Sequence, residues 1–111
     1  MLVAIPADGK DTSSRMAGRF ARAPFFVIFN EDGNIVETID NDVANVAHGA
    51  GGNAVKLLAD HGVDVVIVPQ VGPNASTALK MAGISAHLSQ DSLLSDIIQR
   101  YLQGSLEKIN L

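Results

Sequence analysis

The sequence contains no cysteine, and this absence excludes several kinds of functional site. Without a thiol the chain cannot form disulfides, use a thiolate nucleophile, or hold an iron–sulfur cluster through four protein thiolates. Zinc sites built only from cysteine are excluded for the same reason. Many classes of enzyme are thereby removed.

The chain also lacks an excess of basic residues and any long apolar run. Its 8 Lys and Arg against 12 Asp and Glu give a net charge of −4, whereas nucleic-acid binding rests on a basic face that neutralises phosphates. No segment approaches the ~20 continuous apolar residues of a membrane-spanning helix. Residues 1–6 have no basic leader and are predicted to be a strand, not a signal peptide, which favours a cytoplasmic location. We therefore expect neither nucleic-acid nor membrane partners.

What is present fits one α/β domain over residues 1–111, because a chain of 111 residues supplies apolar side chains for one core. Runs of β-branched and aliphatic residues predict strands, and apolar stripes at helical spacing that end at glycine predict helices. An Asp-Gly turn at 32–33 predicts a hairpin. The predicted strands are 2–6, 25–29, 35–39, 63–68 and 84–88; the predicted helices are 53–61, 71–82 and a last one capped by Asp91 and ending before Gly104, with one helical turn around 16–21. This order predicts a mixed sheet with helices packed against it.

Glycine-containing loops follow the strands or precede the helices, at the positions where open α/β sheets bind ligands. Glycine lets successive N–H groups aim at one point, and a helix N-terminus adds partial positive charge. Each loop alone is better explained by simple turn formation. Together with a basic segment that holds Lys10, Arg15, Arg19 and Arg22, they predict an anion-binding site. The predicted loop contacts are Asp8, Gly9, Gly49, Gly51, Gly52, Gly72 and Asn74.

Histidine can bind a metal or move a proton near neutral pH. His48 stands in the glycine-rich loop and is the best candidate for a metal ligand, although a solvated loop residue would look the same. His61 ends a predicted helix, where an imidazole favours the free carbonyls, and His87 lies in a short strand with a structural role. Three scattered histidines without a His-x-x-x-His pair make a tight zinc site unexpected.

Hydrolytic chemistry has little support. The serines lie in no Gly-x-Ser-x-Gly elbow. A two-metal nuclease needs several carboxylates that converge on strand centres and an adjoining helix, whereas Asp8 and Asp64 are both placed at strand ends. Asp64 is more simply a solvated residue at the start of its strand.

Five short motifs carry a resemblance to a known family: Arg19 to Phe29, His48-Gly49, Gly62 to Ile67, Val71 to Ala75 and Tyr101 to Leu106. In their order and spacing, over nearly the whole chain, the sequence resembles the dinitrogenase iron-molybdenum cofactor biosynthesis family, which includes NifX-like proteins and the C-terminal domain of NifB. The resemblance implies a ribonuclease-H-like, three-layer α/β/α fold, with a five-stranded mixed sheet in the order 3-2-1-4-5 and strand two antiparallel. It also implies that an anionic metal–sulfur cofactor or its precursor is bound or carried without catalytic turnover.

The chain departs from the family at one position that bears on metal binding. Members commonly have His-Phe-Gly where this sequence has Arg19-Phe20-Ala21. A guanidinium can pair with an anionic cluster, but it cannot donate a lone pair to a metal.

Three hypotheses follow for function. The first is a non-enzymatic carrier of an anionic iron–sulfur or molybdenum cofactor, in which Arg19, Phe20, Arg22 and the glycine loops form the cradle and His48 is the metal ligand; the cofactor is not required for folding. The second is a ribonuclease-H-like, metal-dependent enzyme that uses Asp8 and further carboxylates. The third is a regulatory or scaffolding domain that contacts a partner in cofactor assembly through the phenylalanine-rich hairpin at 25–29.

Overall fold

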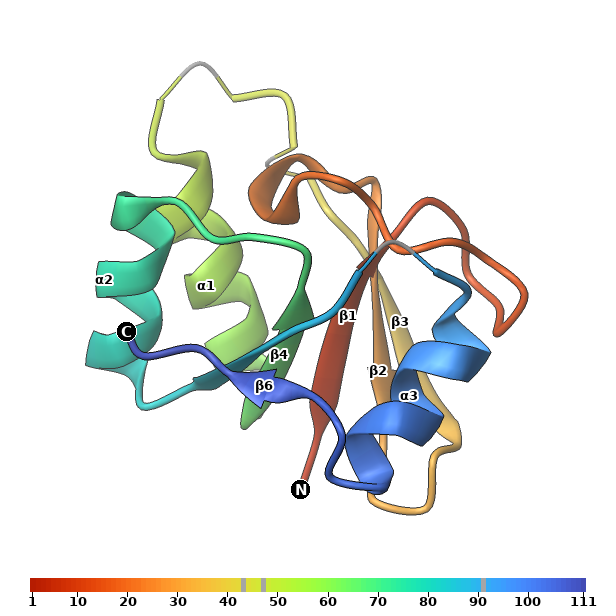
Figure 1. Ribbon diagram of the computed structural model, residues 1–111. Helices are drawn as coiled ribbons and strands as arrows, with labels where there is room; N and C mark the ends of the chain where they lie inside the picture. The colour runs from red at the N-terminus through yellow and green to blue at the C-terminus, as the bar shows by residue number, and fades with distance from the viewer. Residues whose placement is uncertain (43, 47, 91) are drawn as a thin grey trace.

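The computed structural model describes residues 1–42, 44–46, 48–90 and 92–111. The elements are β1 (Val3–Ala7), the 3-10 helix η1 (Phe20–Arg22), β2 (Phe25–Phe29), β3 (Ile35–Asp40), α1 (Ala50–Asp60), β4 (Val65–Val68), α2 (Pro73–Ala82), β5 (Ser85–Leu88), α3 (Leu94–Leu102) and β6 (Glu107–Lys108). Along the chain, strands alternate with helices except at β2 and β3, which follow one another directly (Figure 1). None of the described helices is long and apolar enough to cross a membrane.

The strands form one mixed sheet in the order β3-β2-β1-β4-β5-β6. β1 is antiparallel to β2 and parallel to β4, β4 is parallel to β5, and β2 and β3 form the predicted antiparallel hairpin. The expected five strands were therefore too few. β6 contains only Glu107 and Lys108, so the sequence has no apolar run that would predict a strand there. These two residues form a strand because they pair with the end of β5.

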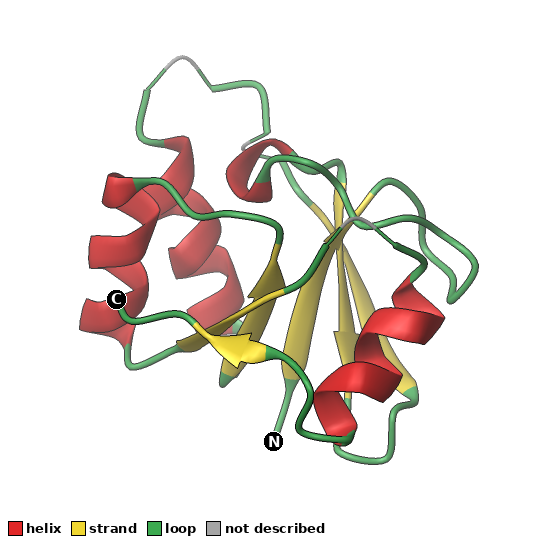
Figure 2. Ribbon diagram, in the orientation of Figure 1, coloured by secondary structure: helices red, strands yellow, loops and turns green. Residues whose placement is uncertain are grey.

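The apolar side chains divide between the two faces of the sheet, which are covered by different helices (Figures 1 and 2). α1, α2 and η1 cover one face, where Leu58 and Leu79 pack with Val66. α3 covers the other, where Leu94 and Ile97 pack with Ile67. The chain thus has helical layers on both sides of the sheet.

Helix boundaries differ from the predicted ones mainly at N-termini. α1 begins at Ala50, three residues early, so Gly51 and Gly52 form its first turn and are not loop residues. Asp91, the predicted cap of α3, lies outside the described residues, and Leu93 stands at the N-cap position. The predicted glycine stops are confirmed at Gly62, Gly83 and Gly104, where φ is between 74° and 76°.

Candidate anion-binding site

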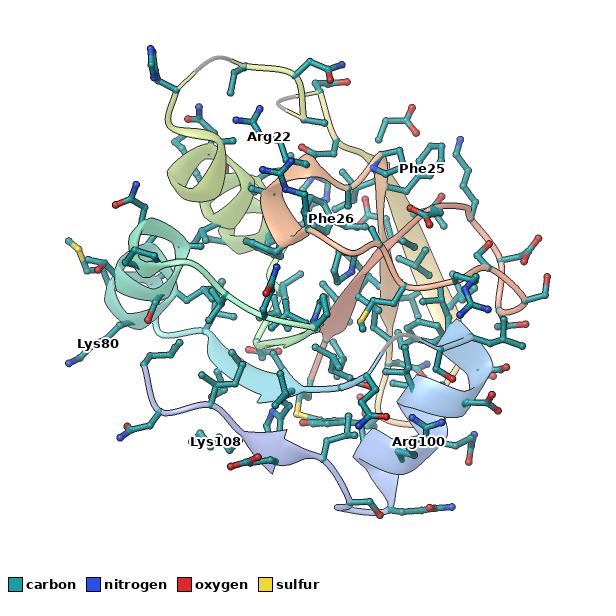
Figure 3. The ribbon with its side chains drawn as sticks, turned by 45° about the horizontal axis from the view of Figure 1, so that its top comes forward. Arg22, Phe25, Phe26, Lys80, Arg100 and Lys108 are labelled. Carbon is teal, nitrogen blue, oxygen red and sulfur yellow. The ribbon has the colours of Figure 1, made fainter. Side chains whose placement is uncertain are left out.

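A cavity of about 620 Å³ opens beyond the carboxyl end of β4, between η1, the start of α1 and the start of α2. In Figure 3 the molecule is turned so that this end comes forward, with Arg22 labelled. Three separate stretches of chain, 19–22, 48–51 and 70–75, make the lining. Eight of the eleven predicted site residues lie in it: Arg19, Phe20, Arg22, His48, Gly49, Gly51, Gly72 and Asn74.

Two helix N-termini point their free backbone N–H groups into this region. The first main-chain bonds of α1 and α2 run from Asn53 N to Gly49 O (3.0 Å) and from Ser76 N to Gly72 O (2.9 Å). The amides that precede these donors have no partner within the helix. Within the described residues neither terminus has a side-chain cap, and neither first turn contains an acidic residue. Both positive ends of the helix dipoles are therefore available to an anion.

The glycines at the two helix starts have different roles. Gly49 has φ +75° and so needs glycine for its left-handed backbone. Gly51 faces Ala75, and a Cβ on Gly51 would lie 3.3 Å from both the N and Cβ atoms of Ala75. Gly51 therefore allows α1 and α2 to approach closely at their N-termini. A Cβ on Gly52 or Gly72 would meet nothing within 4 Å.

Two arginines add formal charge to the cavity. The side chain of Arg19 is exposed, and among the described residues none accepts a hydrogen bond from it. Arg22 donates from Nη1 to Ala44 O (2.9 Å) and Val46 O (2.5 Å). Both partners are neutral carbonyls, and no Asp or Glu occurs among the described lining residues, so the two positive charges are not cancelled locally.

The other two cations of the predicted basic segment lie elsewhere, which corrects the idea of a single basic cluster. Lys10 Nζ lies 3.3 Å from Asp40 Oδ1 and 5.0 Å from the centre of the Phe25 ring. Arg15 forms a backbone bridge with Leu93, next to α3. Closeness in sequence did not bring these side chains to one face.

Three of the predicted contacts, Asp8, Gly9 and Gly52, do not line the cavity. The chain turns back after β1, because Asp8 N donates to Arg15 O at 3.0 Å, and it continues toward the α3 side of the sheet. At Gly9 an added Cβ would collide with the Ser14 hydroxyl. Gly52 lies on the exposed side of the first turn of α1.

The two carboxylates that the sequence places at strand ends are also apart. Asp8 follows β1, whereas Asp64 precedes the parallel strand β4, so they lie at opposite ends of the sheet. Asp64 Oδ2 accepts a hydrogen bond from Leu2 N at 2.8 Å. Among the described residues, no group of three His, Asp or Glu side chains is placed to hold a metal ion.

The histidines separate into one cavity residue and two residues outside its lining. His48 is exposed and lines the cavity. His61 holds the predicted C-cap position of α1, but its Nδ1 lies 3.0 Å from Glu37 Oε2 and not on the helix carbonyls. His87 packs edge-on against Tyr101 with ring centres 5.1 Å apart, as its structural interpretation requires.

The structure adds a packing role for Phe20 and one lining residue, Gln70, that the sequence did not predict. Phe20 is 5% exposed and its ring centre lies 5.5 Å from that of Phe26, so it anchors η1 to the core beneath the cavity. Gln70, which was not predicted, contributes a polar side chain to the lining. The available signal was its position two residues after β4, where a strand end meets the site.

The chain is similar over most of its length to a family of known proteins and to several solved structures. The model of the family described as dinitrogenase iron-molybdenum cofactor matches residues 1–104. An uncharacterized protein of Methanocaldococcus jannaschii is 33% identical, over 97% of this chain and 91% of its own. Similar solved structures are the apo form of the orange protein from Desulfovibrio gigas (TM-score 0.91, 32% identity, 97% and 92% coverage) and a putative NifB protein from Thermotoga (TM-score 0.82, 40% identity, 96% and 91% coverage).

Proposed function

Because the chain belongs to the dinitrogenase iron-molybdenum cofactor family, we propose that it carries an anionic iron–sulfur or molybdenum cofactor, or a precursor of one, in the cavity between η1, α1 and α2. One observation supports this most strongly: two uncapped helix N-termini and two arginines surround a cavity whose described lining has no carboxylate. The volume of about 620 Å³ is in the usual range for small-ligand sites. On the same family grounds we propose a cytoplasmic location.

The residues would hold such a cargo mainly as an anion. The N–H groups at the starts of α1 and α2 donate hydrogen bonds, and Arg19 and Arg22 supply charge-assisted ones. His48 would be a single protein ligand to a metal of the cargo. Since one imidazole cannot complete a coordination shell, the cargo would bring its remaining ligands.

A carrier fits the site better than the two alternatives. Among β1 to β5 only β2 runs opposite to the others, which supports a ribonuclease-H-like motif. The enzyme hypothesis needs further carboxylates beside Asp8, and among the described residues no group of three His, Asp or Glu side chains is placed to hold a metal ion. In the hairpin, Phe26 and Phe29 are fully buried, and the Lys10 ammonium lies over the ring of Phe25. These side chains therefore do not form the exposed apolar surface that the scaffolding hypothesis needs.

The test is a titration with tetrathiomolybdate, a soluble anion of molybdenum and sulfur, followed by absorbance at two salt concentrations. Arg19→Ala should weaken binding and flatten its salt dependence, because one uncompensated charge leaves the cavity. Lys80→Ala is the matched control: Lys80 is an exposed cation in the last turn of α2, so both variants change the net charge equally. Equal affinities and equal salt slopes for the two variants would refute the anion site.

A further inference from the structure

The wall of the cavity that carries the arginines is held by reciprocal hydrogen bonds with the chain that follows β3. Asn41 Nδ2 donates to Ala21 O at 3.0 Å and to Ala23 O at 2.8 Å. In return, Arg22 Nη1 donates to Ala44 O and Val46 O. We call these four hydrogen bonds the η1 latch.

Asn41 is a buried polar residue, 7% exposed, and this makes its hydrogen bonds energetically important. An amide taken out of water is destabilising unless its N–H groups find acceptors. Both acceptors belong to the residues on either side of Arg22. Asn41 also directly follows β3, and its own backbone N donates to Pro24 O at 3.0 Å, so the sheet fixes its position.

The latch also determines the charge that the cavity presents. An arginine held by a carboxylate would be oriented but neutralised, whereas Arg22 is oriented by carbonyls and keeps its full charge. A preorganised donor binds an anion more tightly than a free one, because less side-chain entropy is lost on binding. Its carbonyl partners, Ala44 and Val46, precede His48 in the sequence.

We propose that Asn41 is a positioning residue for the anion site: it holds η1 so that Arg22 presents an oriented, uncompensated charge to the cavity. This inference rests on the proposed function, since it assigns Asn41 a role in binding the same anion. Asn41 does not itself line the cavity, so a loss of binding on its substitution would act through Arg22.

The experiment is a double-mutant cycle of Asn41→Ala and Arg22→Lys, read by tetrathiomolybdate affinity. Arg22→Lys keeps the charge but loses the two-carbonyl geometry. Each single variant should lose about tenfold in affinity, which is the size of one charge-assisted hydrogen bond, and the double variant should lose no more than the larger single effect. Multiplying effects would show that the two residues act independently, and would overturn the proposal.

Two further measurements separate positioning from a general loss of stability. Nitrogen-15 NMR of the Arg22 side chain should show slow guanidinium rotation in the wild type and fast rotation in Asn41→Ala. The control Ile98→Val weakens packing in the opposite layer and should leave both readouts unchanged. If Asn41→Ala keeps wild-type affinity, this inference fails alone; if the wild type binds no tetrathiomolybdate, the proposed function and this inference both fail.

Discussion

The contact between Gly51 and Ala75 gives the sharpest test of how the two helix N-termini form the site. Replacing Gly51 by Ala places a Cβ 3.3 Å from Ala75 N and Ala75 Cβ, and 3.4 Å from Ala75 Cα. Backbone atoms cannot turn away as a flexible side chain can, so α1 and α2 must separate by a few tenths of an ångström. The same change at Gly52 meets open space. The adjacent glycines of one helical turn are therefore a matched pair.

The opposing contributions can be compared. Alanine is favoured over glycine inside a helix by roughly 0.5–1 kcal/mol, and Gly52→Ala should gain up to that amount. Gly51→Ala gains the same propensity term but adds overpacking, which typically costs about 1–3 kcal/mol. We therefore expect Gly51→Ala to be less stable than Gly52→Ala by about 1–3 kcal/mol.

Urea unfolding of the two variants, with equal m-values, measures this difference directly. Because the free N–H groups of both helices move with their axes, Gly51→Ala should also weaken tetrathiomolybdate binding, while Gly52→Ala should leave it at the wild-type level. Equal midpoints and equal affinities would refute the argument that the spacing of the helices shapes the site.

Three more outcomes are expected. His48→Ala should change the free energy of unfolding by less than ~0.5 kcal/mol in urea, as usual for exposed positions, while it weakens binding of a metal-containing anion; marked destabilisation would make His48 structural. Burial, and secondarily the charge of Lys108, lowers the pKa of His87, so the unfolded chain binds its proton more readily. The free energy of unfolding should then fall as the pH drops below about 6.5, and His87→Gln should flatten this part of the profile; an unchanged profile would contradict the assignment. Exhaustive chelation should leave circular dichroism and cooperative unfolding intact, because the core packs without any ligand cage, and loss of the transition would refute this.

Most strands and helices could be predicted because their own residues carry the apolar pattern that burial in a sheet or on a helix face requires. Residues 65–68 form an uninterrupted Val/Ile run and are fully or nearly fully buried, as a strand covered on both faces requires. β6 gave no such signal, since its two charged residues form a strand only through pairing with β5. The early start of α1 was missed because glycine in a first turn looks like a loop in sequence.

Site residues could be predicted where the start of a helix fixes their position. They could not be predicted where the course of a connecting loop decides on which side of the sheet they lie. Gly49, Gly51 and Gly72 follow from helix N-termini at the carboxyl end of a strand. Asp8 and Gly9 have the same local appearance, but hydrogen bonds to the 14–16 segment carry their loop to the other side of the sheet. The hydrogen bonds of Asn41 join residues about twenty positions apart, a relation that no short pattern expresses.

The three stretches that line the cavity, 19–22, 48–51 and 70–75, come together only in the folded chain. A bound anion therefore finds no partial site in the unfolded state, and it shifts the folding equilibrium by the full factor 1 + [L]/Kd. Unfolding of a loaded molecule would therefore release its cargo, whereas the folded chain can also exist empty. A loaded molecule would resist proteases that attack opened chains, while an empty one would be removed sooner, so the lifetime of the protein would report on the supply of its ligand.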